Sequence, residues 1–416
     1  MVRFILLGLA AVASSVLGAD FSREIAEVES GIRTEAKASW WGFDKEDATK
    51  CLQAALDSGV RRLIIDQTGS DWIIQPVFVT RDNQEIVVGE NVVLRAKRGE
   101  FTGVKDSLLT IGGRKNIVLR GEKGAKLVMN KKDYQDASKY KPAEWRHTIN
   151  LLSSENVRIS DLYIASSGGD GIYIGAHRKY AIPRCKDIVI ENVISDDHHR
   201  QGISVICVEN LLIHKSIFKN TKGAPPQAGI DFEPNHFNQT LINCVVTNCE
   251  FSGNAGNGIE HLFSGQNAQT EPFSITYRNC SSYNNNYSAA AVIMRRKKAS
   301  PLRGNIAFEQ CNFLGKVSVI DPGEVFGVQL KDCEIKAPEK AEAAIMIGSY
   351  FNMESPPLGN VTFERVKAGG ARELLAISHK FGVPMLDSIT GSIEFDGKPF
   401  DITAFSKEQM AFNARL

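Results

Sequence analysis

Three acidic residues are spaced so that they could act together. Asp231 and Glu233 alternate with Ile230 and Phe232, and Glu260 follows a similar Gly-Ile pair. In strands, the apolar residues point inward and the acids outward. Carboxylates this close do not ionise independently, and one acquires a raised pKa. Cleavage of a glycosidic bond needs one neutral and one ionised carboxylate. The alternative is a set of solvated acids on an exposed face.

The densest polar segment of the chain is Ser195-Asp196-Asp197-His198-His199-Arg200-Gln201. In this segment His199 could be a general base, and Arg200 could neutralise a substrate carboxylate. Asp197 could orient a histidine or bind a cation. The alternative interpretation is an Asx-rich turn with solvated charges.

Three further residues are candidates for substrate binding. Asp170 precedes Gly171 and is either a turn residue or a ligand in a subsite. Tyr173 is expected to point outward from the same strand. Arg295 begins a basic run, 295–298, that could contact the carboxylates or sulfates of anionic sugars, although such runs are commonly solvated turns.

A metal site has limited support. Asp196, Asp197 and Asp231 offer the oxygen ligands that Ca²⁺ takes. The sequence has no EF-hand or zinc-ligand spacing, because two adjacent histidines on a loop are not a zinc motif. No cofactor is therefore expected, Ca²⁺ is the one cation considered, and no metal ligand is assigned.

The elements that must position these residues form a repeat. Gly-Ile pairs begin short strands at Gly171, Gly202, Gly229 and Gly258, at steps of 31, 27 and 29 residues. A second strand recurs within the same period, at 156–162, 188–193, 211–217, 245–249, 275–280, 306–311, 328–333 and 361–366. No helical pattern separates the strands, which excludes βαβ units. Each repeat is too small to bury its own apolar face, so the repeats must stack.

The repeat also explains four of the eight cysteines. Cys249, Cys280, Cys311 and Cys333 occupy one repeat position. Other copies carry an apolar residue there, namely Leu162, Val193, Ile217 and Val366. This indicates small apolar side chains stacked in the interior. The alternative is a ladder of disulfides or metal ligands, and neighbouring strands do lie within disulfide reach.

The N-terminus has the pattern of a signal peptide. Arg3 precedes the apolar stretch 4–16, and Gly18 and Ala19 offer a cleavage site before Asp20. The apolar stretch is too short to span a bilayer comfortably, so no stable membrane insertion is expected. We therefore expect a secreted protein, extracellular or periplasmic. The formal net charge of +1 gives no global field that would attract nucleic acid.

The two ends of the repeat need covers. The segment 47–56 predicts an amphipathic helix, begun by Asp47 and ended by Gly59, that would cover the first coil. The predicted organisation is a signal peptide at 1–19 and one repeat domain at 20–416. Within it, 20–100 forms the N-terminal cap and first strands, 101–400 the coils, and 401–416 a C-terminal cap.

The segment Trp41-Gly42-Phe43-Asp44-Lys45-Glu46-Asp47-Ala48-Thr49, followed by Leu52-Gln53-Ala54-Ala55-Leu56, resembles the N-terminal cap of the pectate-lyase-like superfamily. The resemblance implies an all-β fold, a single-stranded right-handed parallel β-helix with an N-terminal capping helix. It also implies a polysaccharide as the partner. The superfamily contains lyases, hydrolases, uronan epimerases and phage tailspikes, so the fold does not determine the reaction.

A partial likeness to polygalacturonase-type hydrolases concerns two positions. Asp170-Gly171 is similar to the end of their Asn-Thr-Asp-Gly motif, and Asp196-Asp197 to their Asp pair. Their Gly-His-Gly and Arg-Ile-Lys motifs are absent from this sequence. The likeness therefore transfers no complete catalytic set.

The sequence predicts a secreted glycoside hydrolase that acts on a neutral or anionic polysaccharide. Its predicted catalytic residues are Asp231, Glu233, Glu260 and His199. Its predicted substrate-binding residues are Asp170, Tyr173, Asp197, Arg200 and Arg295. Two alternatives remain: a polysaccharide lyase or uronan epimerase that uses His199 or Arg200 as base, and a non-catalytic carbohydrate-binding or cell-surface β-helix.

Overall fold

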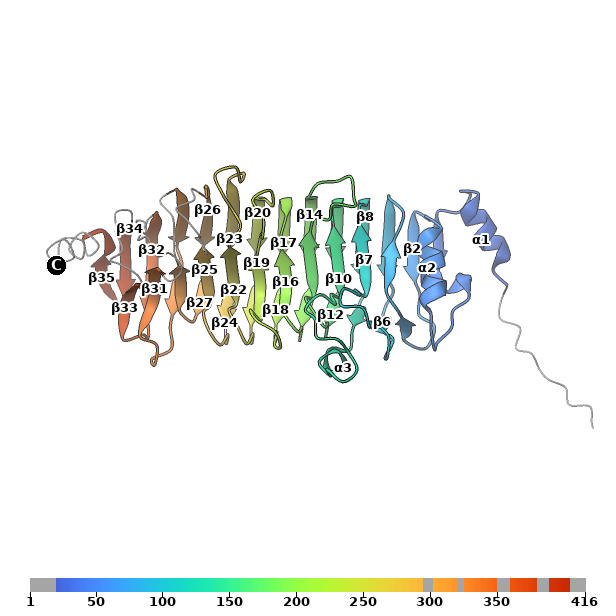
Figure 1. The fold of residues 1–416 in the computed structure, drawn as a ribbon, viewed down its shortest axis with the longest axis horizontal. Helices are drawn as coiled ribbons and strands as arrows, with labels where there is room; N and C mark the ends of the chain where they lie inside the picture. Colours follow the sequence, from blue (N-terminus) through green and yellow to red (C-terminus); the bar gives the residue numbers. More distant parts are fainter. Residues whose placement is uncertain (1–19, 295–301, 321–324, 350–359, 380–388, 405–416) are drawn as a thin grey trace, which may run out of the picture.

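The computed structural model describes residues 20–294, 302–320, 325–349, 360–379 and 389–404. Short strands stack along one long axis, with the N-terminal helices at one end (Figure 1). Every neighbouring pair of strands from β1 to β34 is parallel. The chain is therefore a right-handed parallel β-helix, which confirms the predicted fold class.

One sheet, called sheet B here, carries the Gly-Ile strands. Its strands among the described residues are β4 (Val77–Val79), β7 (Leu109–Gly112), β10 (Ile149–Leu152), β13 (Ile172–Gly175), β16 (Gln201–Val205), β19 (Ala228–Phe232), β22 (Ile259–Phe263), β25 (Ala290–Met294), β28 (Val317–Ile320), β31 (Ala343–Ser349) and β33 (Glu373–His379). Each strand pairs in parallel with the next, so one residue of every coil lies above one residue of the coil before.

The other strands form the remaining walls of the helix. The first series is β1 (Glu35–Lys37), β2 (Arg62–Ile65), β5 (Gln84–Val88), β8 (Lys115–Gly121), β11 (Glu155–Ser160), β14 (Cys185–Glu191), β17 (Val208–His214), β20 (Leu241–Thr247), β23 (Phe273–Arg278), β26 (Gly304–Glu309), β29 (Phe326–Lys331), β32 (Val361–Gly369) and β34 (Ile389–Phe395). The second is β3 (Trp72–Ile74), β6 (Val93–Ala96), β9 (Lys126–Val128), β12 (Tyr163–Ala165), β15 (Ile194–Asp196), β18 (Ile217–Lys219), β21 (Glu250–Ser252), β24 (Ser281–Tyr283), β27 (Asn312–Leu314) and β30 (Glu334–Lys336). A final strand, β35 (Lys398–Asp401), pairs with β34 in antiparallel orientation.

The register of sheet B follows the Gly-Ile repeat. Ile172, Ile203, Ile230 and Ile259 are Cα partners in successive coils, and all four are fully buried. The inward direction predicted for these residues is confirmed. Because side chains alternate along a strand, the residue after each isoleucine points away from the core.

A left-handed backbone residue turns the chain between the two other walls. Asn192, Asn248 and Asn279 have φ values between 51° and 54°, a region that asparagine enters more readily than most residues. The side chain of Asn192 donates a hydrogen bond to Oδ1 of Asp161, its equivalent in the coil before, at 2.7 Å. The residue that follows each of these asparagines points into the interior.

The predicted cysteine stack occupies this interior position. Cys249, Cys280, Cys311 and Cys333 are buried and carry free thiols. One member of the apolar set was assigned wrongly. The strand partner of Ile194 is Ile217, so the residue level with the stack in that coil is the buried Ser216.

The N-terminal end is covered by helices. These are α1 (Ser22–Glu29), a 3-10 turn (Ala38–Trp41) and α2 (Thr49–Asp57). The α2 helix buries Cys51, Leu52, Ala55 and Leu56, which confirms the predicted cap, and Oδ1 of Asp47 accepts the Thr49 backbone N–H. A short helix, α3 (Lys131–Tyr134), lies on a long connection between β9 and β10.

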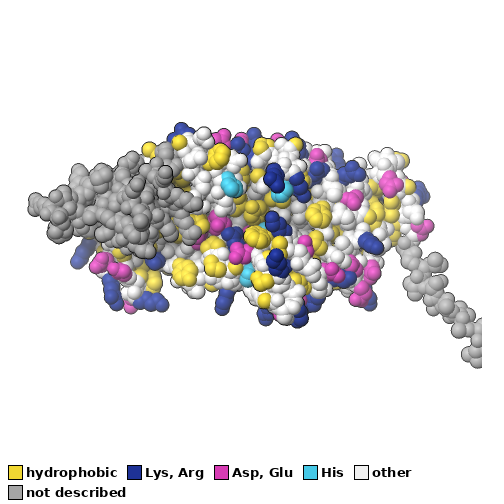
Figure 2. Space-filling model, viewed as in Figure 1, with side chains coloured by type: hydrophobic (Ala, Val, Ile, Leu, Met, Phe, Trp, Pro, Cys, Tyr) yellow, Lys and Arg dark blue, Asp and Glu magenta, His cyan; other side chains and the backbone are white. Residues whose placement is uncertain are grey.

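The predicted signal peptide at 1–19 and most of the predicted C-terminal cap, 405–416, lie outside the described residues. In the described part of the chain, no helix has both the length and the apolar character to cross a bilayer. Figure 2 shows basic, acidic and apolar side chains interspersed on one face of the molecule, as the near-zero net charge leads one to expect.

Candidate functional site

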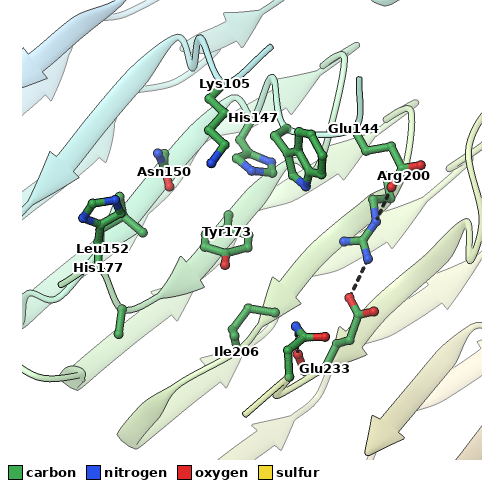
Figure 3. Close-up of a pocket in the computed structure, with 13 residues that line it drawn as sticks. Lys105, Glu144, His147, Asn150, Leu152, Tyr173, His177, Arg200, Ile206 and Glu233 are labelled. Carbon is green, nitrogen blue, oxygen red and sulfur yellow. Dashed lines mark hydrogen bonds and ion pairs between the residues drawn. The ribbon is translucent and has the colours of Figure 1, made fainter. Parts of the chain in front are cut away.

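A groove of about 610 Å³ opens on the outer face of sheet B, across the coils of β7 to β19 (Figure 3). Polar and aromatic side chains dominate its lining. The lining residues are Lys105, Glu144, Trp145, His147, Asn150, Leu152, Tyr173, Ala176, His177, Arg200, Ile206, Glu233 and Asn235.

These residues come from the connections before sheet-B strands, from the strands themselves and from the residues that follow them. Lys105, Glu144 and Arg200 lie in the connections that lead into sheet-B strands. Tyr173 lies on β13 itself, one residue after the inward Ile172, so alternation places it on the outer face. The groove is therefore assembled across successive coils rather than within one.

Arg200 is the centre of the charged part of the groove. Its Nη2 atom is 2.5 Å from Oε2 of Glu233, and its Nε atom is 3.4 Å from Oε2 of Glu144. Figure 3 shows the guanidinium between these two carboxylates. Burial alone would lower the pKa of Arg200, but the nearby carboxylates of Asp170, Glu233 and Asp231 raise it. Arg200 therefore remains a fixed cation.

Asp170 lies behind Arg200 and is fully buried. Its Oδ2 atom is 3.7 Å from Nη1 of Arg200 and 3.4 Å from Nδ1 of His147. Burial raises the pKa of Asp170 to about 7, although Arg200 opposes the shift. Asp170, the predicted subsite residue, is thus close to the groove but not part of its lining.

His147 was not predicted, although it lines the groove. Its Nδ1 atom accepts the backbone N–H of Asp170 at 3.0 Å, which assigns the ring proton to Nε2. The ring stacks on Tyr173 with centroids 4.8 Å apart and an interplanar angle of 18°. Burial, followed by the nearby charge of Arg200, lowers the pKa of His147 to about 3, so the imidazole stays neutral near pH 7.

Tyr173 lines the groove as an outward-pointing residue of β13. Burial, with the nearby carboxylate of Asp170, raises the pKa of Tyr173 to about 12. Its hydroxyl is therefore protonated near neutral pH and is available as a hydrogen-bond donor.

The two stacked acids differ from the prediction in their exposure. Asp231 and Glu260 are Cα partners as expected, but they are 0% and 5% exposed and do not line the groove. Each of the two acids accepts a hydrogen bond from a polar side chain at or just before the start of a sheet-B strand. Gln201 donates to Oδ2 of Asp231 at 2.9 Å, and Asn257 donates to Oε2 of Glu260 at 2.6 Å.

Asp231 is held in a strongly acidic environment. Burial, then the charges of Glu260 and Glu233, raise the pKa of Asp231 well above its usual value. Its Oδ1 atom has no hydrogen-bond partner among the described residues. The prediction that Asp231 is exposed on the surface and directly accessible is therefore wrong, because the side chain is fully buried.

The predicted loop 196–200 contributes only Arg200 to the groove. His199 faces the α3 segment, where its Nδ1 atom is 2.9 Å from the side-chain amide of Gln135. Asp197 bonds to Lys131 at 2.6 Å and to the hydroxyl of Ser166 at 3.0 Å. Neither residue lines the groove, and the backbone turns at Asp197, whose φ is 57°.

The considered Ca²⁺ ligands do not converge. Asp196 accepts the Tyr163 hydroxyl at 2.9 Å, Asp197 pairs with Lys131, and Asp231 lies on sheet B. No cluster of three or more potential metal ligands occurs within the described ranges. Arg295 lies outside the described residues.

No family model and no curated protein matches this sequence. Solved structures with similar folds include the A-module of a mannuronan C-5 epimerase from Azotobacter vinelandii, at 11% identity and a TM-score of 0.56, which covers 85% of this chain and 97% of that one. The catalytic unit of an α-1,3-glucanase from Streptomyces thermodiastaticus matches at 12% identity and a TM-score of 0.55, covering 87% and 69%.

A surface protein and adhesin of Streptococcus pneumoniae also matches, at 13% identity and a TM-score of 0.55, covering 86% of this chain and 100% of that one. At these identities the likeness establishes the fold. The chain has the right-handed parallel β-helix fold that its N-terminal segment predicted.

Proposed function

We propose that the protein is a secreted carbohydrate-active enzyme that hydrolyses a polysaccharide in the sheet-B groove. The observation that carries this proposal is that Glu144 and Glu233 both line the groove and both contact Arg200. Two carboxylates that flank a sugar are the usual machinery of glycoside hydrolysis. Arg200 fixes their separation, because it contacts each of them through a different nitrogen.

The two acids have different surroundings, which suggests different roles. Glu233 is 15% exposed and accepts a charge-assisted hydrogen bond from Arg200, which suits the ionised partner. Glu144 is 44% exposed and lies farther from Arg200, which suits the proton donor. Asp231 and Glu260 lie behind this pair. We propose that they position Glu233 and Arg200 without touching substrate.

The rest of the lining fits a sugar chain. Trp145 is 47% exposed and offers an apolar ring face, and Lys105 lies 5.9 Å above that ring. Asn150 and His177 add polar groups that can exchange hydrogen bonds with hydroxyls. This mixture of aromatic surface and polar groups matches the alternating apolar and hydroxylated faces of a sugar.

A second candidate is a polysaccharide lyase or uronan epimerase. It is favoured by the stack of His147 on Tyr173 beside Arg200. In this reaction Arg200 would face a substrate carboxylate, and the Tyr173 or His147 side chain would exchange the proton at the neighbouring carbon. The residues differ from those predicted from sequence, because His199 faces α3.

The deciding experiment is a screen of the purified protein on neutral and uronate-containing polysaccharides. Hydrolysis predicts new reducing ends without the ultraviolet absorbance of unsaturated uronate. Reducing ends together with that absorbance would replace the hydrolase with a lyase. Binding with neither cleavage nor a change in uronate configuration would favour the third interpretation, a carbohydrate-binding surface protein.

A further inference from the structure

A second groove, of about 740 Å³, lies farther along sheet B. Its walls are the connections that lead into β25, β28 and β31, together with side chains on β31 and β33. Its lining residues are Asn284, Asn285, Asn286, Tyr287, Leu314, Gly315, Lys316, Lys336, Ala337, Pro338, Lys340, Ala341, Glu342, Ala343, Met346 and Ala376. We call it the lysine groove.

The lysine groove has an unbalanced positive charge. Lys316, Lys336 and Lys340 line it, and Glu342 is the one acidic residue in its lining. None of the three lysines forms an ion pair with another described residue. Elsewhere on the molecule, basic side chains such as Lys186, Arg278 and Lys331 pair with an acid of the neighbouring coil. Three unpaired ammonium groups around one cavity favour an anionic ligand.

Aromatic and amide groups accompany the charge. Tyr287 is 65% exposed and Leu314 is 52% exposed, so the groove presents apolar surface to solvent. Asn284 and Asn286 add side-chain amides that both donate and accept hydrogen bonds. An exposed aromatic ring beside amides and cations suits a sugar that carries carboxylate or sulfate groups.

The two grooves lie along the same edge of sheet B. Both are walled by the connections that enter the strands, from 105 to 200 in the first groove and from 284 to 343 in the second. On the outer face of sheet B, six successive Cα pairings between neighbouring strands lead from Tyr173 through Asp231 to Met346. At about 4.8 Å per strand, Tyr173 in the first groove and Met346 in the second are roughly 29 Å apart along the helix axis.

We propose that the lysine groove is a remote binding site for an anionic polysaccharide, which it holds while another part of the same chain occupies the first groove. This inference rests on the proposed function, since it takes a polysaccharide as the ligand. A second contact on one polymer raises its overall affinity without any change at the first groove.

The test measures binding of the full chain to dextran sulfate, to unmodified dextran and to polygalacturonate. The variant replaces Lys316, Lys336 and Lys340 together with alanine. The control replaces Lys45, Lys50 and Lys123, three exposed lysines outside both grooves, and changes the net charge equally. Affinity electrophoresis at two salt concentrations gives the dissociation constants.

We expect salt-sensitive binding to at least one of the two anionic polymers and weaker binding to dextran. The groove variant should bind that polymer about tenfold more weakly, whereas the control should bind within about twofold of the unmodified protein. A preference for dextran sulfate or for polygalacturonate would identify sulfate or carboxylate as the recognised group.

Equal weakening in both triple variants would overturn the proposal, because net charge alone would then explain the effect. Unchanged binding in the groove variant would also overturn it. The outcome is separable from that of the hydrolase proposal. If no polymer is cleaved but the groove variant alone loses binding, the lysine groove stands and the hydrolase fails.

Discussion

The carboxylate of Asp170 faces the inner side of the Arg200 guanidinium, with Oδ2 3.7 Å from Nη1, and solvent does not reach it. The Nη2 atom of the same guanidinium contacts Glu233 in the groove. Buried Asp170 therefore shares one cation with the two groove acids, Glu233 and Glu144. Because Arg200 stays a cation, the protonation of Asp170 changes the net charge of this buried cluster.

The first prediction concerns stability against pH. The pKa of Asp170 rises from 3.8 to about 7 on folding, so the folded protein keeps a proton that the unfolded chain releases. The free energy of unfolding should therefore fall as the pH rises from about 4 to 7, by up to about 4 kcal/mol from this group. Asp170→Asn should remove this dependence.

Urea denaturation of the two proteins at several pH values checks this. The stability of Asp170→Asn relative to the unmodified protein should increase between about pH 4 and pH 8. Parallel stability curves across this range would mean that Asp170 is already ionised in the folded state.

The second prediction concerns the proposed acid pair. Glu233→Gln should lower turnover by at least about 100-fold, because a carboxamide cannot act as nucleophile or base. The fold should be unaffected, since the side chain is accessible from the groove. Reducing-end release measures the rate, and Glu90→Gln, at an exposed position outside the groove, is the control. Full activity of Glu233→Gln would exclude this site.

The third prediction separates the two reactions. Tyr173→Phe keeps the aromatic ring that stacks on His147 but removes the hydroxyl. A hydrolase that uses Glu144 and Glu233 should lose less than about tenfold in rate, the effect of one hydrogen bond. A lyase that uses the tyrosine as its acid or base should lose about 100-fold or more. The rates of formation of reducing ends and of unsaturated product distinguish these cases.

The fourth prediction concerns the cysteine stack. Cys280 is fully buried, so Cys280→Asp must bury a carboxyl group without a prepared partner. We expect it to destabilise the protein by more than about 3 kcal/mol, and Cys280→Ala to cost about 1 kcal/mol. Urea midpoints report the difference. Equal stability of the two variants would contradict an interior position.

The fifth prediction concerns export. Protein recovered from its host should begin near Ala19 or Asp20, because the preceding residues have the pattern of a cleaved signal peptide. N-terminal sequencing checks this directly. A soluble cytoplasmic product that begins at Met1 would contradict it.

The coils could be predicted from sequence because their periodic residues obey a simple rule. Ile172, Ile203 and Ile230 repeat at a nearly constant spacing, and each must face the core for the stack to bury apolar surface. The left-handed turn residues mark where one wall ends and the next begins. The one error in the stack, Ile217 for Ser216, arose where the stack position holds a polar serine and the next residue is apolar.

The groove was harder to predict because its connections have no period. Glu144 and Trp145 lie on the long segment between β9 and β10. One signal was available, since His147 precedes Ile149 as Asp170 precedes Ile172 in the next coil. The alternation of side chains correctly predicted that Asp231 points away from the core. It did not predict that Asp231 is buried, because the burial comes from neighbouring polar side chains such as Gln201.

Because each coil adds one strand to sheet B, each coil lengthens the molecule by one strand spacing. Lys105 enters the first groove ahead of β7, and Glu233 follows β19, four strand spacings farther along. Removing any coil between them would bring the two sides about 4.8 Å closer and dismantle the site. A coil added beside β22 would leave both grooves whole and change only their separation. The number of coils between the two grooves therefore sets the distance between them in steps of one strand.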